Sequence, residues 1–239
     1  MSDWSARDWS DDMTGRAPGT VGGNVVQFND GDRGNVLRFD GVDYYVSFGD
    51  RDELDSPSRF TLSLWFNKGE DLVDRPTNHG IDNVLIAQSS GLSNDNFEVG
   101  TQGSMVEVYI DSGLSGALDT SVIIEAGITL NHWHHLAIVY GTEMSLYIDG
   151  NKITTWTQYN GKLDDSTTSP LTLGLARPNS DSWGEFKGLM QGVQIFDTEL
   201  SSTKTLAPMN KLLKDHLRVG ILSPCSLKCG ERLLLNETQ

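Results

Sequence analysis

The chain has 239 residues, of which 37% are hydrophobic, enough for one large domain with its own core. Acidic residues outnumber basic residues by 33 to 18, and the resulting net charge of −15 argues against binding nucleic acid through phosphate contacts. No apolar run approaches the roughly 18–20 residues that a membrane-spanning helix needs, so membrane insertion is not expected. The first twelve residues also lack the basic and apolar segments of a secretory signal.

The first half of the chain alternates apolar and polar residues in short runs that end at turn sequences. Such alternation buries one face of a β-strand, and an Asp-Gly pair favours a tight turn after it. The segment 60–66, FTLSLWF, has Phe60, Leu62 and Leu64 on one face and Trp65 on the other. Apolar residues on both faces predict a central strand that is covered on both sides. Other strands are expected at 25–28, 37–40, 46–48, 84–87, 97–99 and 105–111.

The same pattern continues to about residue 200. Segments 133–140 and 144–148 form a predicted hairpin, and Asp149-Gly150 turns the chain into a strand at 153–158. A strand at 171–175 precedes a loop at 177–185 that is rich in Pro, Asn, Ser, Asp and Gly, and 186–196 forms the last strand. About a dozen short strands with frequent turns predict an all-β fold, an antiparallel β-sandwich of the jelly-roll type.

The sequence changes character after Leu200. Apolar residues then recur at helical spacing, which predicts an amphipathic helix over 201–218, with Pro208 tolerated only in its first turn or as a kink. Residues 220–239 show no strand pattern, so an irregular end is expected. Both cysteines, Cys225 and Cys229, lie in this tail, where a disulfide and two free thiols remain alternatives.

Five segments, in this order, resemble the laminin G-like (concanavalin A-type) jelly roll. They are LRFDGVDYYV at 37–46, FTLSLWF at 60–66, WHHLAIVY at 133–140, MSLYIDG at 144–150 and FKGLMQGVQIFDTELS at 186–201. The order of all five is more specific than any one of them. The chain is therefore divided into an N-terminal arm at 1–23, a laminin G-like domain at 24–201 and a C-terminal tail at 202–239.

The resemblance implies an extracellular binding module for glycans, proteins or surfaces, in a family that often holds calcium at the rim of the sandwich. Asp43 and the carbonyl of Asp40 are the candidate calcium ligands. The family's second acid after Asp43 is replaced by Tyr44, and its Asp pair in the last strand is replaced by Gln191 and Gly192. Because calcium takes six to eight oxygen ligands, these losses weaken an inherited site and leave calcium an open expectation.

Two patterns that could indicate chemistry have simpler explanations. His132 and His134 lie on the same side of a predicted strand, but zinc needs three or four ligands and no other cluster completes the set. The nearest carboxylates on one strand, Glu107 and Asp111, would lie roughly 13 Å apart along it. Glycoside hydrolysis needs two carboxyl groups about 5–9.5 Å apart, so an enzyme is not expected.

Aromatic residues near polar loop residues indicate where a glycan could bind, because sugar rings stack on aromatic side chains. Trp183 with Asn179 and Asp181 gives this mixture on a rim loop, and Trp156 with Tyr159 gives a second pair. The alternative for Trp183 is that it plugs the end of the sandwich.

The favoured hypothesis is a non-catalytic binding or adhesion module that recognises a glycan or a protein surface through rim loops. The alternative is a structural subunit of an assembled particle, such as a viral capsid decoration or tail protein, self-assembling through the N-terminal arm and the C-terminal tail. Both hypotheses predict an extracellular or virion-surface location, and an enzyme ranks third.

Overall fold

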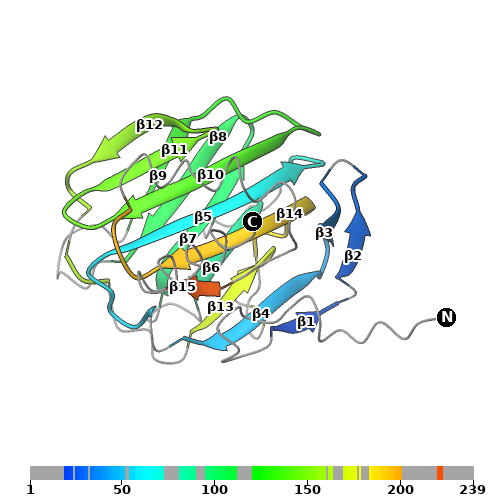
Figure 1. Ribbon diagram of the computed structural model, residues 1–239, viewed down its shortest axis with the longest axis horizontal. Coiled ribbons are helices and arrows are strands. Elements are labelled where there is room, and N and C mark those ends of the chain that lie inside the picture. Colours follow the sequence, from blue (N-terminus) through cyan, green and yellow to red (C-terminus); the bar gives the residue numbers. More distant parts are fainter. Residues whose placement is uncertain are drawn as a thin grey trace, which may run out of the picture.

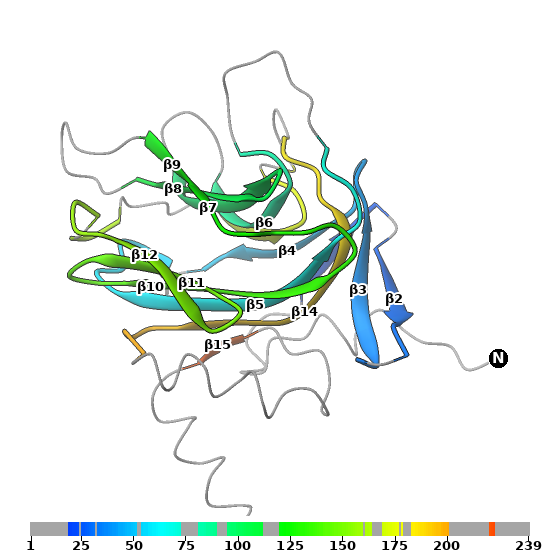
Figure 2. The same ribbon diagram turned by 90° about the horizontal axis from the view of Figure 1, so that it is seen from above.

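The computed structural model in Figure 1 describes most of the domain and a short piece of the tail. The described residues are 19–23, 25–31, 33–51, 54–72, 81–89, 95–111, 120–159, 161–163, 169–176, 178, 183–200 and 220–222. Within these ranges the chain forms β-strands and no α-helix, and thus no helix able to cross a membrane. Two sheets pack face to face, as Figure 2 shows, which confirms the predicted β-sandwich.

The first sheet has seven antiparallel strands. Their spatial order is β1 (Thr20–Gly22), β4 (Tyr45–Asp50), β13 (Pro170–Leu173), β6 (Val84–Ser89), β7 (Asp95–Gln102), β8 (Met105–Ile110) and β9 (Thr120–Glu125). Strands from both ends of the domain thus meet in one layer, which is typical of a jelly roll rather than of a simple meander.

The second sheet has eight strands. Its order is β12 (Asn151–Trp156), β11 (Met144–Ile148), β10 (Trp133–Tyr140), β5 (Phe60–Lys68), β14 (Lys187–Phe196), β3 (Asn35–Asp40) and β2 (Val26–Asn29), with β15 (Gly220–Leu222) parallel to β14. The predicted central strand at 60–66 does lie in the middle of this sheet. Gly220–Leu222, expected to be irregular, instead joins the sheet as β15 and so ties part of the tail to the domain.

Period-two alternation places the core between the two sheets. In β5, Leu62, Leu64 and Phe66 are completely buried and point into the core. Val106 and Val108 of β8 are also completely buried in this core, from the other sheet. Burial of a large aliphatic or aromatic side chain contributes about 1.5–3 kcal/mol, so these rows supply most of the driving force for pairing the sheets.

The hairpin between β11 and β12 follows the predicted turn. Asp149 and Gly150 both have positive φ, at 49° and 81°, the conformation that a two-residue type I′ turn needs. Glycine adopts it without strain, and the short polar side chain of aspartate tolerates it.

The N-terminal arm up to residue 18, the predicted helix at 201–218 and the two cysteines lie outside the described residues. The sequence pattern missed two strands: β9 inside the predicted domain, and β1, which lies in the predicted N-terminal arm but pairs with β4.

Candidate functional site

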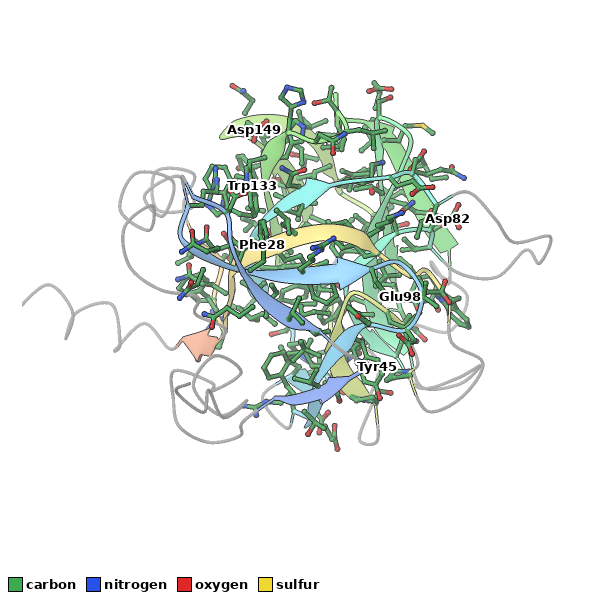
Figure 3. The ribbon with its side chains drawn as sticks, turned by 90° about the vertical axis from the view of Figure 1, so that its right-hand side faces the viewer. Phe28, Tyr45, Asp82, Glu98, Trp133 and Asp149 are labelled. Atoms are coloured by element: carbon green, nitrogen blue, oxygen red, sulfur yellow. The ribbon has the colours of Figure 1, made fainter. Side chains whose placement is uncertain are left out.

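The outer face of the seven-stranded sheet, the side turned away from the core, carries a row of neighbouring side chains. Residues Ala87, Glu98, Tyr109 and Ser121 lie side by side on β6, β7, β8 and β9, because each is paired with the next in the register of the sheet. Side chains in such a row contact their cross-strand neighbours. In Figure 3, Glu98 lies on the opposite side of the molecule from Trp133 of the other sheet.

A small apolar cluster, separate from the main core, covers part of this outer face. Its buried members are Ile81, Val84, Ala87 and Ala176, and the partly buried rings of Tyr109 and Trp183 pack against them. Trp183 is thus neither a fully buried plug nor a fully exposed side chain. The ring packs on the outer face of the sheet and is partly exposed, and a glycan-binding role for it stays a prediction.

Main-chain hydrogen bonds hold Trp183 in place at the base of its loop. Trp183 and Ala176 form an antiparallel bridge in which each amide donates to the other's carbonyl, at 3.4 and 3.1 Å. The amide of Val84 donates to the carbonyl of Gly184 at 2.6 Å, which fixes the next residue against β6. Gly184 has φ of 70°, and a Cβ atom there would collide with the main-chain oxygen of Ile81. Only glycine therefore lets the chain pass this close to the sheet.

The indole of Trp183 is also oriented by a carboxylate. Its Nε1 donates a hydrogen bond to Oε2 of Glu98 at 3.3 Å. Glu98 is only 2% exposed, so this carboxylate meets the nitrogen edge of the indole below the protein surface and not in solvent. Alternation along β7 predicts that Glu98 points outward, because Phe97 and Val99 on either side of it face the core. Its hydrogen bond with Trp183 could not be predicted from this pattern.

A second carboxylate, Glu107, lies diagonally across from Glu98. Glu98 pairs with Tyr109 and Gly100 pairs with Glu107, and such diagonal neighbours are about 7–8 Å apart. Burial raises the pKa of the Glu107 carboxyl, the hydrogen bond from Ser121 opposes this rise, and the nearby charge of Asp82 adds to it. The two buried acids are thus diagonal neighbours on adjacent strands, a proximity that residue spacing along one strand does not reveal.

Asp82 and Gln102 provide partly exposed polar groups at the end of the same face. Gln102 Nε2 donates to Oδ2 of Asp82 at 3.2 Å, and the amide of Thr101 donates to the Asp82 carbonyl at 3.2 Å. Figure 3 shows Asp82 on the same side of the molecule as Glu98. The outer face therefore combines partly exposed aromatic rings with partly exposed hydrogen-bonding groups, over two buried carboxylates.

The comparisons with known proteins agree with this architecture. Residues 40–204 match the family model of the concanavalin A-like lectin/glucanases superfamily, of the laminin G type. The chain belongs to this superfamily. The match runs from the end of β3 to beyond β14, so it includes strands of both sheets of the laminin G-like domain. A search of curated protein sequences finds no significant match.

Solved structures similar to the laminin G-like chain include domain 4 of AbnA, an extracellular arabinanase from Geobacillus stearothermophilus, in complex with arabinotriose. The TM-score is 0.60 at 19% identity, over 84% of this chain and 92% of that one. The binding domain of Paraclostridial Mosquitocidal Protein 1 has a TM-score of 0.58 at 16% identity, over 82% of this chain and 48% of that one. The binding domain of botulinum neurotoxin serotype G has a TM-score of 0.57 at 13% identity, over 80% of this chain and 46% of that one. The chain thus spans about half of the toxin domains. At these identities the likeness is one of fold.

The second aromatic pair lies elsewhere in the laminin G-like fold. Trp156 and Tyr159 contact each other edge to face, with ring centroids 6.4 Å apart, and both pack in the main core cluster. Tyr159 is completely buried, so its ring is a core contact and does not face a ligand. Trp156 is partly buried on the edge strand β12. Asn179 and Asp181 lie outside the described residues.

The predicted calcium ligands lie in the turn after β3. Oδ1 of Asp40 accepts hydrogen bonds from the amides of Val42 and Asp43, at 2.9 and 3.4 Å, and so stabilises this turn. Asp43 is exposed. In the described part of the laminin G-like chain, no three His, Cys, Asp or Glu residues are grouped so that they could hold a metal. Calcium at Asp40 and Asp43 stays a prediction.

The histidines at 132–135 have separate partners. Nε2 of His134 accepts a hydrogen bond from the amide of Thr129 at 3.1 Å, so its Nδ1 carries the proton that faces Asp149 at 2.8 Å. His135 Nε2 lies 2.8 Å from the hydroxyl of Ser63. His132 Nδ1 lies 2.9 Å from the carbonyl of Leu130. Each ring thus stabilises a different loop or strand of the framework.

Proposed function

We propose that this laminin G-like chain is a non-catalytic binding module that recognises a glycan at the outer face of the seven-stranded sheet. The observation that carries the proposal is the placement of Trp183 at the rim of this face, with its indole bound to Glu98. A partly exposed indole offers an apolar surface on which a sugar ring stacks, and an amphipathic ring of this kind is common at binding surfaces.

Hydrogen-bonding groups beside the rings fit the hydroxyl groups of a sugar. Asp82, Gln102 and Tyr109 are partly exposed on the same face. Binding sites commonly combine an apolar surface with a few polar groups that fix the orientation of the ligand. The similar arabinanase domain was solved in complex with arabinotriose, and the similar toxin domains are described as binding domains, which supports a binding role here.

The burial of the two acids supports a role without catalysis. A general acid or base must come within hydrogen-bonding distance of the group it protonates, about 2.6–3.2 Å. Glu98 is 2% exposed and Glu107 is 8% exposed. Carboxylates buried to this extent are poorly placed to reach the scissile bond of a ligand on the surface.

The test is affinity gel electrophoresis of the full chain in gels that contain soluble polysaccharides. Trp183→Ala is expected to reduce retardation to a degree that corresponds to a loss of about ten-fold in affinity or more, about 1.4 kcal/mol. Trp156→Ala is the matched control, because it removes a partly buried tryptophan from the opposite sheet. Thermal unfolding of both variants checks that they are folded.

Retardation that survives Trp183→Ala, or that is lost equally with Trp156→Ala, would place binding elsewhere. If no polysaccharide retards the chain and the chain instead binds a purified protein, recognition of a protein surface would be favoured.

A structural subunit is the second candidate, and one observation favours it. The edge strand β2 exposes Val26 by 45% and Phe28 by 39%, with the Arg38 guanidinium 5.8 Å from the Phe28 ring. Exposed apolar side chains on an edge strand are sites where sheets associate. Light scattering over a range of concentrations tests it: a defined oligomer that Phe28→Ser dissociates would support assembly, and a monomer throughout would count against it.

A further inference from the structure

On the basis of the proposed glycan-binding function, we infer that the outer face of the seven-stranded sheet selects uncharged glycans and excludes acidic ones. The inference rests on the distribution of charge between the two sheets and on the depth of the acids beneath the aromatic surface.

The charges of the two sheets are opposite in sign. None of the seven strands β1, β4, β13, β6, β7, β8 and β9 contains a lysine, arginine or histidine, although Glu98, Glu107 and Glu125 are among their residues. Every lysine and arginine in a described strand belongs to the eight-stranded sheet: Arg38, Lys68, Lys152 and Lys187. A ligand carboxylate or sulfate on the outer face of the seven-stranded sheet would therefore meet no cationic partner from the strands beneath it.

Two of the acids are buried, so each interacts more strongly with a nearby charge when it is ionised, and burial at the same time raises the pKa of Glu107. Glu98 and Glu107 are 2% and 8% exposed, so water screens them less than it screens exposed surface acids. Burial is the main cause of the raised pKa of Glu107, and the charge of Asp82 adds to it, so Asp82 and Glu107 are close enough to repel each other when both are ionised. An acidic sugar would add a further negative charge to this group, and like charges brought together at an interface oppose binding.

An uncharged sugar avoids this repulsion and gains from the same groups. Ionised carboxylates only accept hydrogen bonds, whereas sugar hydroxyl groups can donate them. The partly exposed carboxylate of Asp82 is suited to such a donor.

The experiment compares two classes of polysaccharide with the full chain in affinity gels at low salt. Arabinan, xylan and mixed-linkage β-glucan are the uncharged probes, and polygalacturonate and heparin are the acidic probes. At least one uncharged probe is expected to retard the chain through Trp183, and the acidic probes are expected to bind at least about ten-fold more weakly, as estimated for like-charge contacts.

The double variant Glu98→Gln/Glu107→Gln removes both buried charges and keeps the side-chain size. The glutamine at 98 still offers an oxygen to the Trp183 indole. The ratio of acidic to uncharged binding is expected to rise about ten-fold or more, about 1.4 kcal/mol. Glu125→Gln is the matched control, because Glu125 is an exposed acid of β9 that bonds Ser104 and the amide of Gly127, and the ratio should not change.

The outcomes separate the two proposals. Acidic probes that bind as well as uncharged ones, and that depend on Trp183, would overturn the charge selectivity and leave the glycan-binding function in place. A ratio that the double variant does not change would also overturn the selectivity. Failure of every probe to retard the chain would overturn the proposed glycan-binding function, and the selectivity with it.

Discussion

The buried histidine of β10 predicts how the stability of the sandwich depends on pH. His135 is 1% exposed, and its ring lies against Trp65 with the centroids 5.0 Å apart. Burial lowers its pKa from 6.5 to about 4; the charge of Asp149 opposes this effect, and the charge of Arg33 adds to it. The folded chain therefore holds His135 neutral under conditions in which the unfolded chain would protonate it.

The size and sign of the effect follow from the two pKa values. Between pH 6.5 and pH 4 the unfolded state binds more protons at this site than the folded state does. The free energy of unfolding therefore falls as the pH falls through this window, and the loss is complete below the folded pKa. A difference between 6.5 and about 4 corresponds to about 3 kcal/mol, at 1.36 kcal/mol for each pH unit.

Urea denaturation at pH 7 and at pH 4 measures this contribution. The variant His135→Gln cannot be protonated there, so its loss of stability between the two pH values is expected to be about 3 kcal/mol smaller than that of the wild type. His132→Gln, at an exposed position, is the control and is expected to follow the wild type. If the wild type and His135→Gln lose the same stability, the ring is not held neutral by burial, and the reasoning fails.

Three other substitutions test the packing. Lys68→Met removes a buried ammonium group that donates hydrogen bonds to Asp71 at 2.8 Å and to the carbonyl of Gly103 at 2.6 Å. Urea denaturation should show that the free energy of unfolding falls by about 3 kcal/mol, as expected for breaking a buried ion pair. A fall near zero would contradict this role. Leu64→Ala, at a completely buried position, is expected to lower the free energy of unfolding by about 2–5 kcal/mol in the same assay. Arg33→Ala removes cation–π contacts to Trp65 and Trp133, 4.0 and 4.5 Å from the ring centroids, and is expected to cost about 1 kcal/mol and to change the tryptophan fluorescence.

The layers of the fold could be predicted because burial on one face imposes a period of two. Val106 and Val108 alternate with Glu107 in the sequence, and they separate in the same way between core and outer face in the structure. The family segments predicted the jelly-roll class, whereas the order of the strands within each sheet came from the structure. β9 was missed, since Ile123 and Ile124 are adjacent and blur the alternation although only Val122 and Ile124 pack against the core.

The site could be predicted only in part, because it depends on contacts between strands. Trp183 was identified from the composition of its loop, but Glu98 became its partner only through the register of β7 against β6 and β8. Composition also selected Tyr159, whose ring is completely buried. Aromatic content indicates that a ring packs against something, and the three-dimensional fold decides whether that is the core or a ligand.

The position of β14 has a consequence for how the polypeptide acquires its structure during synthesis. This strand lies between β3 and β5, so residue 187 pairs with residue 40, from the opposite end of the domain. The ribosome must therefore release nearly the whole domain before the middle of the eight-stranded layer can close. Contacts between such distant residues are slow to form, typically in milliseconds to seconds. Until then the edges of β3 and β5 remain unpaired, and the nascent polypeptide at this stage is the one on which a chaperone would act.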